Sequence, residues 1–255
     1  MGINGPAYSV IYPSDLDAET EIEVAWTVVQ RILPTADSAV LQLDLDVLPD
    51  EDRDFVTSVR NGARSIEDGL YYLAPDDPEL LHRIVTFGSP YRNVVLEWLE
   101  LRCDDECLLN YVPDHGILEI DVTAVEGLEE INNELERSGA AVVSEQSVPA
   151  WQENGAQVSI EPPSVCVGRD AVSSRTCFSL ADVDSVAVDH NPRTIELSWE
   201  NKGGSLPQRA IGAVFERLGD DRPGQVTFAS ETEWQAAVSL FESLPDVTVN
   251  RHSVE

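Results

Sequence analysis

The chain has 255 residues, of which 42% are hydrophobic, and its 47 acidic residues against 16 basic ones give a formal net charge of −31. This apolar content excludes a disordered chain, and the length suits one large domain or two smaller ones. The apolar runs are too short for a transmembrane helix and the first residues carry no secretory signal, so we expect a cytoplasmic protein with no membrane partner.

The first third of the chain alternates expected strands and helices. In chain order these are a strand over 8–12, a helix over 18–33, a strand over 41–47, a helix around Phe55 and Val59, and a helix over 78–87. Within 41–47, apolar residues alternate with polar ones, which places Asp44 and Asp46 on the polar face of one strand. Asp77 is the expected N-cap of the helix that begins at Pro78.

Residues 93–122 predict a three-stranded antiparallel meander. Its strands are expected over 94–101, 107–112 and 117–122, with turn-forming residues between them. Thr123 and Glu126 have the spacing of a capping box, so we expect a helix to begin after Thr123. Gly139 should end that helix before a return strand over 140–143.

Periodicity is lost over 146–155, so we expect a linker between an N-terminal domain of residues 1–145 and a C-terminal domain of residues 156–255. The strands expected after it are 158–160, 165–167, 177–180, 183–188, 194–199 and 226–228. A helix is expected over 207–217, and Ser230 and Glu233 form the capping box of a final amphipathic helix. The fold class is therefore α+β: a mixed αβ lobe with a meander, then a small β-rich lobe closed by a helix.

The basic residues comprise a single lysine, Lys202, and fifteen arginines, and the acidic residues are spread along the whole chain. This composition resembles that of cytoplasmic proteins from haloarchaea, which accumulate molar salt. The resemblance implies that the acidity reflects the solvent. It therefore gives no evidence for a basic partner, and nucleic acid is not indicated by any basic helix.

The charge is unevenly divided. Residues 1–150 carry a net charge of −23, and residues 151–255 carry −8. The less acidic C-terminal lobe is therefore the better candidate for binding another protein. Its candidate contact residues are the basic side chains in expected loops or at the ends of elements: Arg169, Arg175, Arg193, Lys202 and Arg209.

The C-terminal lobe resembles prokaryotic pleckstrin-homology-like domains. The similarity is carried by the strand segments 178–189 and 194–199, the Pro192-Arg193 turn between them, the segment 226–228 and the helix 234–244. The family implies short strands in two orthogonal sheets, plugged at one end by a C-terminal helix, and a role in protein interaction. The helix at 207–217 and the lack of a basic lipid-binding loop depart from the family.

Candidate chemistry is sparse. Asp44 and Asp46, roughly 7 Å apart on one strand face, could share a divalent cation in a metal-dependent hydrolase or nuclease. Cys103 and Cys107 have the spacing of half a zinc site, but we expect all four cysteines, with Cys166 and Cys177, to be free thiols. No phosphate-binding or dinucleotide motif is present, so no cofactor is expected. The first hypothesis is a non-enzymatic adaptor or regulatory protein, and the metal-dependent hydrolase is the alternative.

Overall fold

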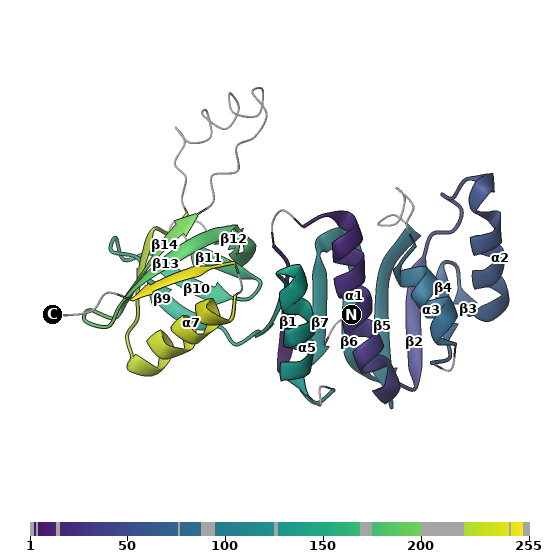
Figure 1. Ribbon diagram of the computed structural model, residues 1–255, viewed down its shortest axis with the longest axis horizontal. Coiled ribbons are helices and arrows are strands. Elements are labelled where there is room, and N and C mark those ends of the chain that lie inside the picture. Colours follow the sequence, from purple (N-terminus) through teal and green to yellow (C-terminus); the bar gives the residue numbers. More distant parts are fainter. Residues whose placement is uncertain are drawn as a thin grey trace, which may run out of the picture. The chain divides into compact units, whose positions relative to one another are not determined.

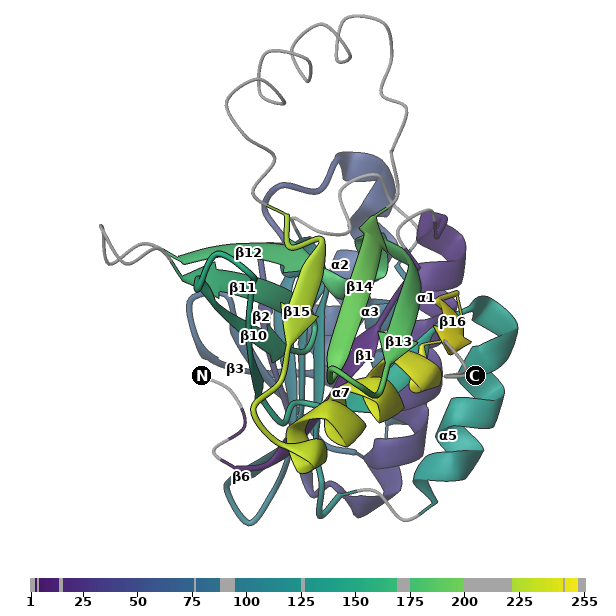
Figure 2. The same ribbon diagram turned by 90° about the vertical axis from the view of Figure 1, so that its left-hand side faces the viewer.

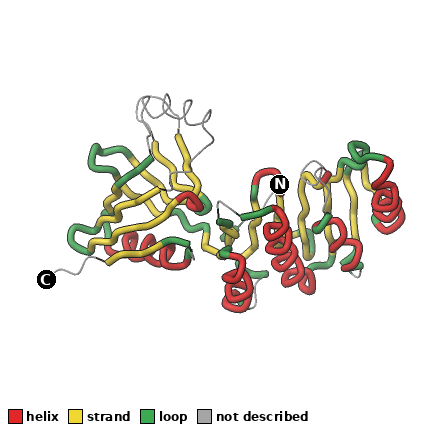
Figure 3. Tube along the Cα trace, turned by 45° about the horizontal axis from the view of Figure 1, so that its top comes forward, coloured by secondary structure: helices red, strands yellow, loops and turns green. Residues whose placement is uncertain are grey.

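The computed structural model describes residues 3, 5–13, 16–75, 77–87, 95–124, 127–168, 175–199, 222–244 and 246–251. The chain divides into two compact units, Met1–Glu145 and Gln146–Glu255. Helices and antiparallel strands occur in both units (Figure 3), so the α+β class is confirmed.

The first unit is an eight-stranded sheet with helices packed on one face (Figure 1). Its strands lie in the order β3-β4-β2-β5-β6-β7-β1-β8, and all described pairings are antiparallel. They are β1 (Ala7–Ile11), β2 (Ser38–Leu43), β3 (Arg64–Glu67), β4 (Leu70–Leu73), β5 (Leu96–Cys103), β6 (Glu106–Val112), β7 (Ile117–Asp121) and β8 (Ala141–Ser144). The helices are α1 (Ala18–Ile32), α2 (Arg53–Gly62), α3 (Pro78–Val85) and α5 (Leu128–Leu135).

The core of this unit lies between the helices and the inward face of the sheet. Leu41, Leu99 and Tyr111 stand opposite one another on β2, β5 and β6, and none of them is exposed. Alternate residues of each strand face the same side, so these three belong to one continuous apolar row. Val28 of α1 is fully buried in the same cluster. The helical face read from the sequence is thus the face that packs on the sheet.

Turn and capping residues in the sequence account for several elements of the first unit. The meander β5–β6–β7 is confirmed, and Asp104 and Asp105 make its first turn with positive φ angles of 50° and 69°, as a two-residue hairpin turn requires. Asp77 caps α3 by accepting a hydrogen bond from the Leu80 amide at 3.1 Å, as predicted. The hairpin β3–β4 was not predicted, although Asp68-Gly69, with φ +73° at the glycine, is a typical turn pair.

Two predictions in this unit are wrong. The strand β2 ends at Leu43, so Asp44 and Asp46 lie in the turn after it and not on a strand face. The turn forms because the Asp46 amide donates to the Asp44 carboxylate at 3.2 Å, a bond that competes with strand pairing. Thr123 also caps no helix: it bonds to the Asp121 carboxylate, and α5 begins at Leu128 after Gly127.

The second unit is also built on eight strands, in the order β12-β11-β10-β9-β15-β14-β13-β16. They are β9 (Val148–Trp151), β10 (Gln157–Glu161), β11 (Ser164–Gly168), β12 (Arg175–Ser179), β13 (Val183–Asp189), β14 (Thr194–Trp199), β15 (Gln225–Thr227) and β16 (Thr248–Arg251). Residues 146–155 are therefore no linker, because they contain β9. In Figure 2, β10 to β12 run across the view, whereas β13 to β15 run up it.

A single long helix, α7 (Glu231–Ser243), packs against the strands in the described part of this unit (Figure 3). Its predicted capping box is confirmed: the Glu233 amide donates to the Ser230 hydroxyl at 3.2 Å, and the Ser230 amide donates to the Glu233 carboxylate at 2.9 Å. Trp234 and Phe241 lie on its buried face. The helix predicted over 207–217 lies outside the described residues.

Candidate functional site

Cys166 and Cys177 form a disulfide, so the expectation of four free thiols is wrong. The two residues stand directly opposite each other on β11 and β12, with their Cα atoms 4.0 Å apart. Val165 and Val167, which flank Cys166, are buried inward. Since successive strand residues face opposite sides, the disulfide lies on the outer face of the sheet.

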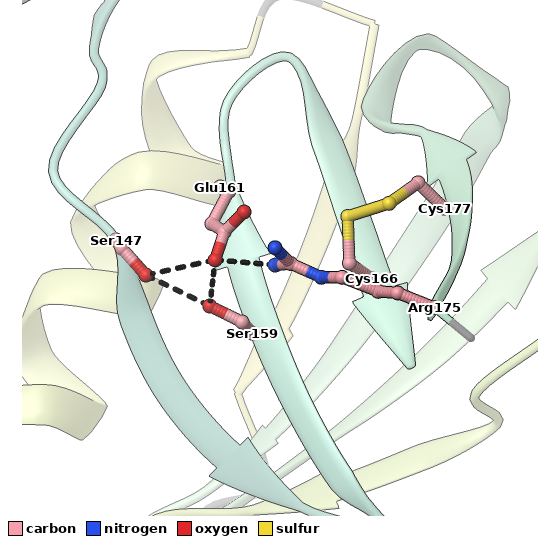
Figure 4. The surroundings of a disulfide bond; sticks show 6 residues. All are labelled: Ser147, Ser159, Glu161, Cys166, Arg175 and Cys177. Atoms are coloured by element: carbon pink, nitrogen blue, oxygen red, sulfur yellow. Dashed lines mark hydrogen bonds and ion pairs between the residues drawn. A yellow bond between two sulfur atoms is a disulfide. The ribbon is translucent and has the colours of Figure 1, made fainter. Parts of the chain in front are cut away.

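A polar network surrounds this disulfide on the same outer face (Figure 4). The Ser159 hydroxyl donates to Glu161 at 2.6 Å and lies 2.7 Å from the Ser147 hydroxyl. Arg175 forms an ion pair with Glu161, and both side chains are partly exposed. Burial opposes ionisation of Glu161, but the hydrogen bonds from Arg175 and Ser159 outweigh it and lower the pKa of this carboxyl.

The route of the Arg175 side chain follows from the strand register. Arg175 stands opposite Gly168 on β11, and Glu161 stands opposite Ser164, four residues back along the same strand. The Arg175 side chain must therefore reach diagonally across β11, and Figure 4 shows its guanidinium at Glu161. Gly168 has no side chain to obstruct that path. Arg175 thus ties the outermost strand β12 to β10.

The five basic residues singled out by the sequence are not all placed. Arg169, Lys202 and Arg209 lie outside the described residues. Arg193 follows the turn after β13 and is half-buried, and its carbonyl accepts a hydrogen bond from the Phe228 amide at 3.0 Å. The structure therefore locates two of the five side chains, Arg175 and Arg193.

An aromatic cluster beside β12 was missed by sequence reasoning. Phe178 and Trp199 have ring centroids 5.9 Å apart, and the Arg222 guanidinium lies 5.7 Å from the Trp199 ring. The Trp199 indole donates to the Pro223 carbonyl at 2.8 Å. The only available signal was the alternation of β12, which places Phe178 on the opposite face from Cys177.

Asp44 and Asp46 line one shallow polar pocket of about 280 Å³ together with Asp68 and Glu97. The Arg60 guanidinium lies 3.5 Å from Asp46 and its positive charge opposes a cation there. Throughout the described ranges, no group of three or more histidine, cysteine, aspartate or glutamate side chains could hold a metal ion.

Cys103 and Cys107 do not form half of a zinc site. The register pairs Cys103 with Glu106 and Cys107 with Arg102, so the two thiols lie on opposite faces of the β5–β6 hairpin. Burial, followed by the charge of Glu100, raises the pKa of Cys107 to about 11. Burial and the charge of Asp104 also raise the pKa of Cys103. Both thiols therefore stay protonated at neutral pH and react slowly.

The face of the first sheet opposite the described helices carries a largely buried polar row, which the sequence did not reveal. Glu100, Asn110, Glu119 and Ser9 stand opposite one another on β5, β6, β7 and β1. Glu100 is only 1% exposed and forms an ion pair with Arg102 on the same strand. Asn110 donates to Glu119 at 2.8 Å. Ser9 donates its hydroxyl to Glu145, so the three buried groups Ser9, Glu100 and Asn110 each have a polar partner, as stability requires.

No protein-family model, no curated protein and no solved structure matches this chain. Within the described part of the chain, none of the helices is both long and apolar enough to cross a membrane.

Proposed function

We propose that the chain is a non-enzymatic adaptor or regulatory protein of a salt-rich cytoplasm, and that it binds another protein through its second unit. The observation that carries this proposal is the position of β12. Within the described residues β12 pairs with β11 alone, at the end of the strand order, so one row of its backbone amides and carbonyls has no strand partner. Such an edge can accept an extended segment of a partner as a further strand.

The side chains of β12 suit a partner segment that carries carboxylates. Arg175 and Cys177 are exposed on the outer face of this strand. A guanidinium binds a carboxylate through two parallel hydrogen bonds, which gives orientation as well as attraction. A partner carboxylate would take the place of Glu161, which now pairs with Arg175 on the same sheet.

The pleckstrin-homology-like reading of the second unit supports the proposal. The strands β9 to β12 form one antiparallel meander, β13 to β15 form a second, and the pair Trp151–Thr227 joins them. The helix α7 follows and contacts β9. Up to α7 this order is the one that the family resemblance implies, two short sheets followed by a helix, whereas β16 follows the helix and pairs parallel with β13, which departs from it.

The metal-dependent hydrolase is the weaker alternative. It required both carboxylates on one strand face, and Asp44 and Asp46 instead follow the end of β2. Arg60 lies beside Asp46, where a divalent cation would have to bind.

Capture experiments test the adaptor proposal. The full chain, the Arg175→Glu variant and the Arg251→Glu variant would be immobilised in molar KCl and exposed to an extract of the cells that contain the protein. Arg251 is the matched control, because it is also an exposed arginine in an ion pair, with Glu242, but lies on β16 at the other end of the strand order. We expect Arg175→Glu alone to lose a captured protein, with a melting temperature close to that of Arg251→Glu, which also loses an exposed ion pair. Identical captured sets for all three proteins would refute the proposal.

A further inference from the structure

The disulfide lies where a solution thiol can reach it. Cys177 is exposed and belongs to β12, the outermost strand, whereas Cys166 on β11 is only 4% exposed. Exchange begins when a thiolate attacks one sulfur, so access decides whether the reaction occurs and which sulfur is attacked. An attacking thiolate can therefore reach the sulfur of Cys177 more easily than the sulfur of Cys166.

Polar side chains lie on the same face of the sheet as the disulfide. Arg175 precedes Cys177 by two residues on the same face, and its guanidinium is directed at Glu161 (Figure 4). The Ser159 hydroxyl stands opposite Cys166 on β10. Both groups already bind Glu161, Arg175 through an ion pair and Ser159 by donating its hydroxyl proton, so a thiolate at Cys166 has to share them with that carboxylate. At the free thiols Cys103 and Cys107, burial and neighbouring acidic residues raise the pKa, and at Cys107 they outweigh the opposing charge of Arg102.

We propose that Cys166–Cys177 is a reversible redox site, reduced by a small dithiol or a dithiol protein. One thiolate of the reductant attacks the sulfur of Cys177; the bond between the two cysteine sulfurs breaks, and Cys166 leaves as a thiolate and takes a proton from water. The second thiol of the reductant then attacks the first reductant sulfur, which is bonded to Cys177 in the mixed disulfide, and Cys177 is released. The reductant becomes a disulfide, and two electrons and two protons pass to the cysteines. A small disulfide such as oxidised glutathione reverses the sequence.

Reduction changes how β12 is held. In the oxidised chain, the disulfide fastens β12 to β11 and the Arg175–Glu161 ion pair fastens it to β10. After reduction, the strand keeps its backbone pairing with β11, the ion pair and the contact of Phe178 with Trp199. The site therefore sets how firmly the outer strand is attached.

The test uses the full chain, folded in molar KCl and without denaturant. Protein is incubated with millimolar dithiothreitol, samples are alkylated at intervals, and the peptides that contain each cysteine are weighed by mass spectrometry. We expect Cys166 and Cys177 to become alkylated together within minutes, and to form the disulfide again when oxidised glutathione replaces the dithiol. A disulfide that resists reduction until denaturant is added would overturn the proposal, as would a pair that stays reduced in oxidised glutathione.

Two single variants test which sulfur is attacked. Cys166→Ser leaves Cys177 free, and Cys177→Ser leaves Cys166 free. Because access limits the reaction, we expect the first variant to form its mixed disulfide with oxidised glutathione at least about tenfold faster than the second. Equal rates would refute the assignment of Cys177 as the attacked residue. If a variant does not fold, the reduction kinetics of the wild-type chain still decide the proposal.

Discussion

The buried ion pair of the first unit offers the sharpest test of the energetics. Glu100 is 1% exposed, and its partner Arg102 donates from Nε at 2.8 Å while keeping 26% of its side chain exposed. Arg102→Met would leave a carboxylate charge in the sheet without its counter-charge. Breaking a buried pair in this way costs about 3–5 kcal/mol of unfolding free energy. Because water reaches part of Arg102, we expect about 3 kcal/mol, at the lower end of that range.

The double variant Glu100→Gln/Arg102→Met separates the charge from the packing. Glutamine has the shape of glutamate and methionine replaces the aliphatic stem of arginine, so the double variant removes both charges with little loss of packing and should regain most of the stability lost by Arg102→Met. Urea unfolding in constant molar KCl would measure all four proteins of the cycle, with Glu100→Gln as the fourth. The reasoning fails if Arg102→Met costs less than about 1 kcal/mol, the range of a surface pair, or if Glu100→Gln brings no recovery.

Other predictions concern the caps, the core and the solvent. Ser230→Ala should lower the stability of the second unit by about 1 kcal/mol, and Phe241→Ala should lower it by about 3–5 kcal/mol, both measured by urea unfolding. The hydrogen bond from the Thr20 amide is the main cause that lowers the pKa of Asp17 in the folded chain. The ionised Asp17 therefore stabilises the fold above pH 3.8, and this stabilisation is lost as the pH falls through the lowered pKa of the folded state. Asp17→Asn should remove that part of the acid dependence of stability, measured by unfolding at a series of pH values. Diluting the salt from molar to millimolar KCl should lower the melting temperature, because a net charge of −31 repels itself when screening weakens; an unchanged value would argue against salt adaptation.

Elements with local signals could be predicted from the sequence. The N-cap Asp77, the capping box at Ser230 and the alternation of the meander each depend on residues within a few positions of one another. The end of β2 was predicted wrongly. The alternation of apolar and polar residues continues past Leu43, but the strand ends there and the Asp44 carboxylate accepts a hydrogen bond from the Asp46 amide. Local competition for hydrogen bonds is not visible in the hydrophobic pattern.

Elements that depend on distant residues could not be predicted. The strand β9 was taken for a linker because it contains Pro149, which has no amide hydrogen to donate. The structure tolerates this proline because β9 pairs along its length with β10 and meets β15 only at Trp151. The disulfide is similar: its formation depends on the register that sets Cys166 opposite Cys177, and spacing in the sequence does not give register.

The large net charge of the chain says little about how β12 and Arg175 would bind a partner. Several arginines pair with acidic side chains of their own unit: Arg31 with Glu134, Arg53 with Asp50, Arg60 with Asp46, Arg102 with Glu100, Arg175 with Glu161, and Arg251 with Glu242. A partner carboxylate that binds Arg175 must therefore replace Glu161, and exchanging one exposed ion pair for another changes the free energy little. In 1 M salt the screening length is about 3 Å, so long-range attraction adds almost nothing. Most of the wild-type affinity would then come from backbone pairing along β12, and partner binding should survive changes in salt that abolish purely electrostatic complexes. Arg175→Glu is still expected to prevent binding, because it sets a carboxylate in direct contact with the partner's carboxylate, where screening is weakest.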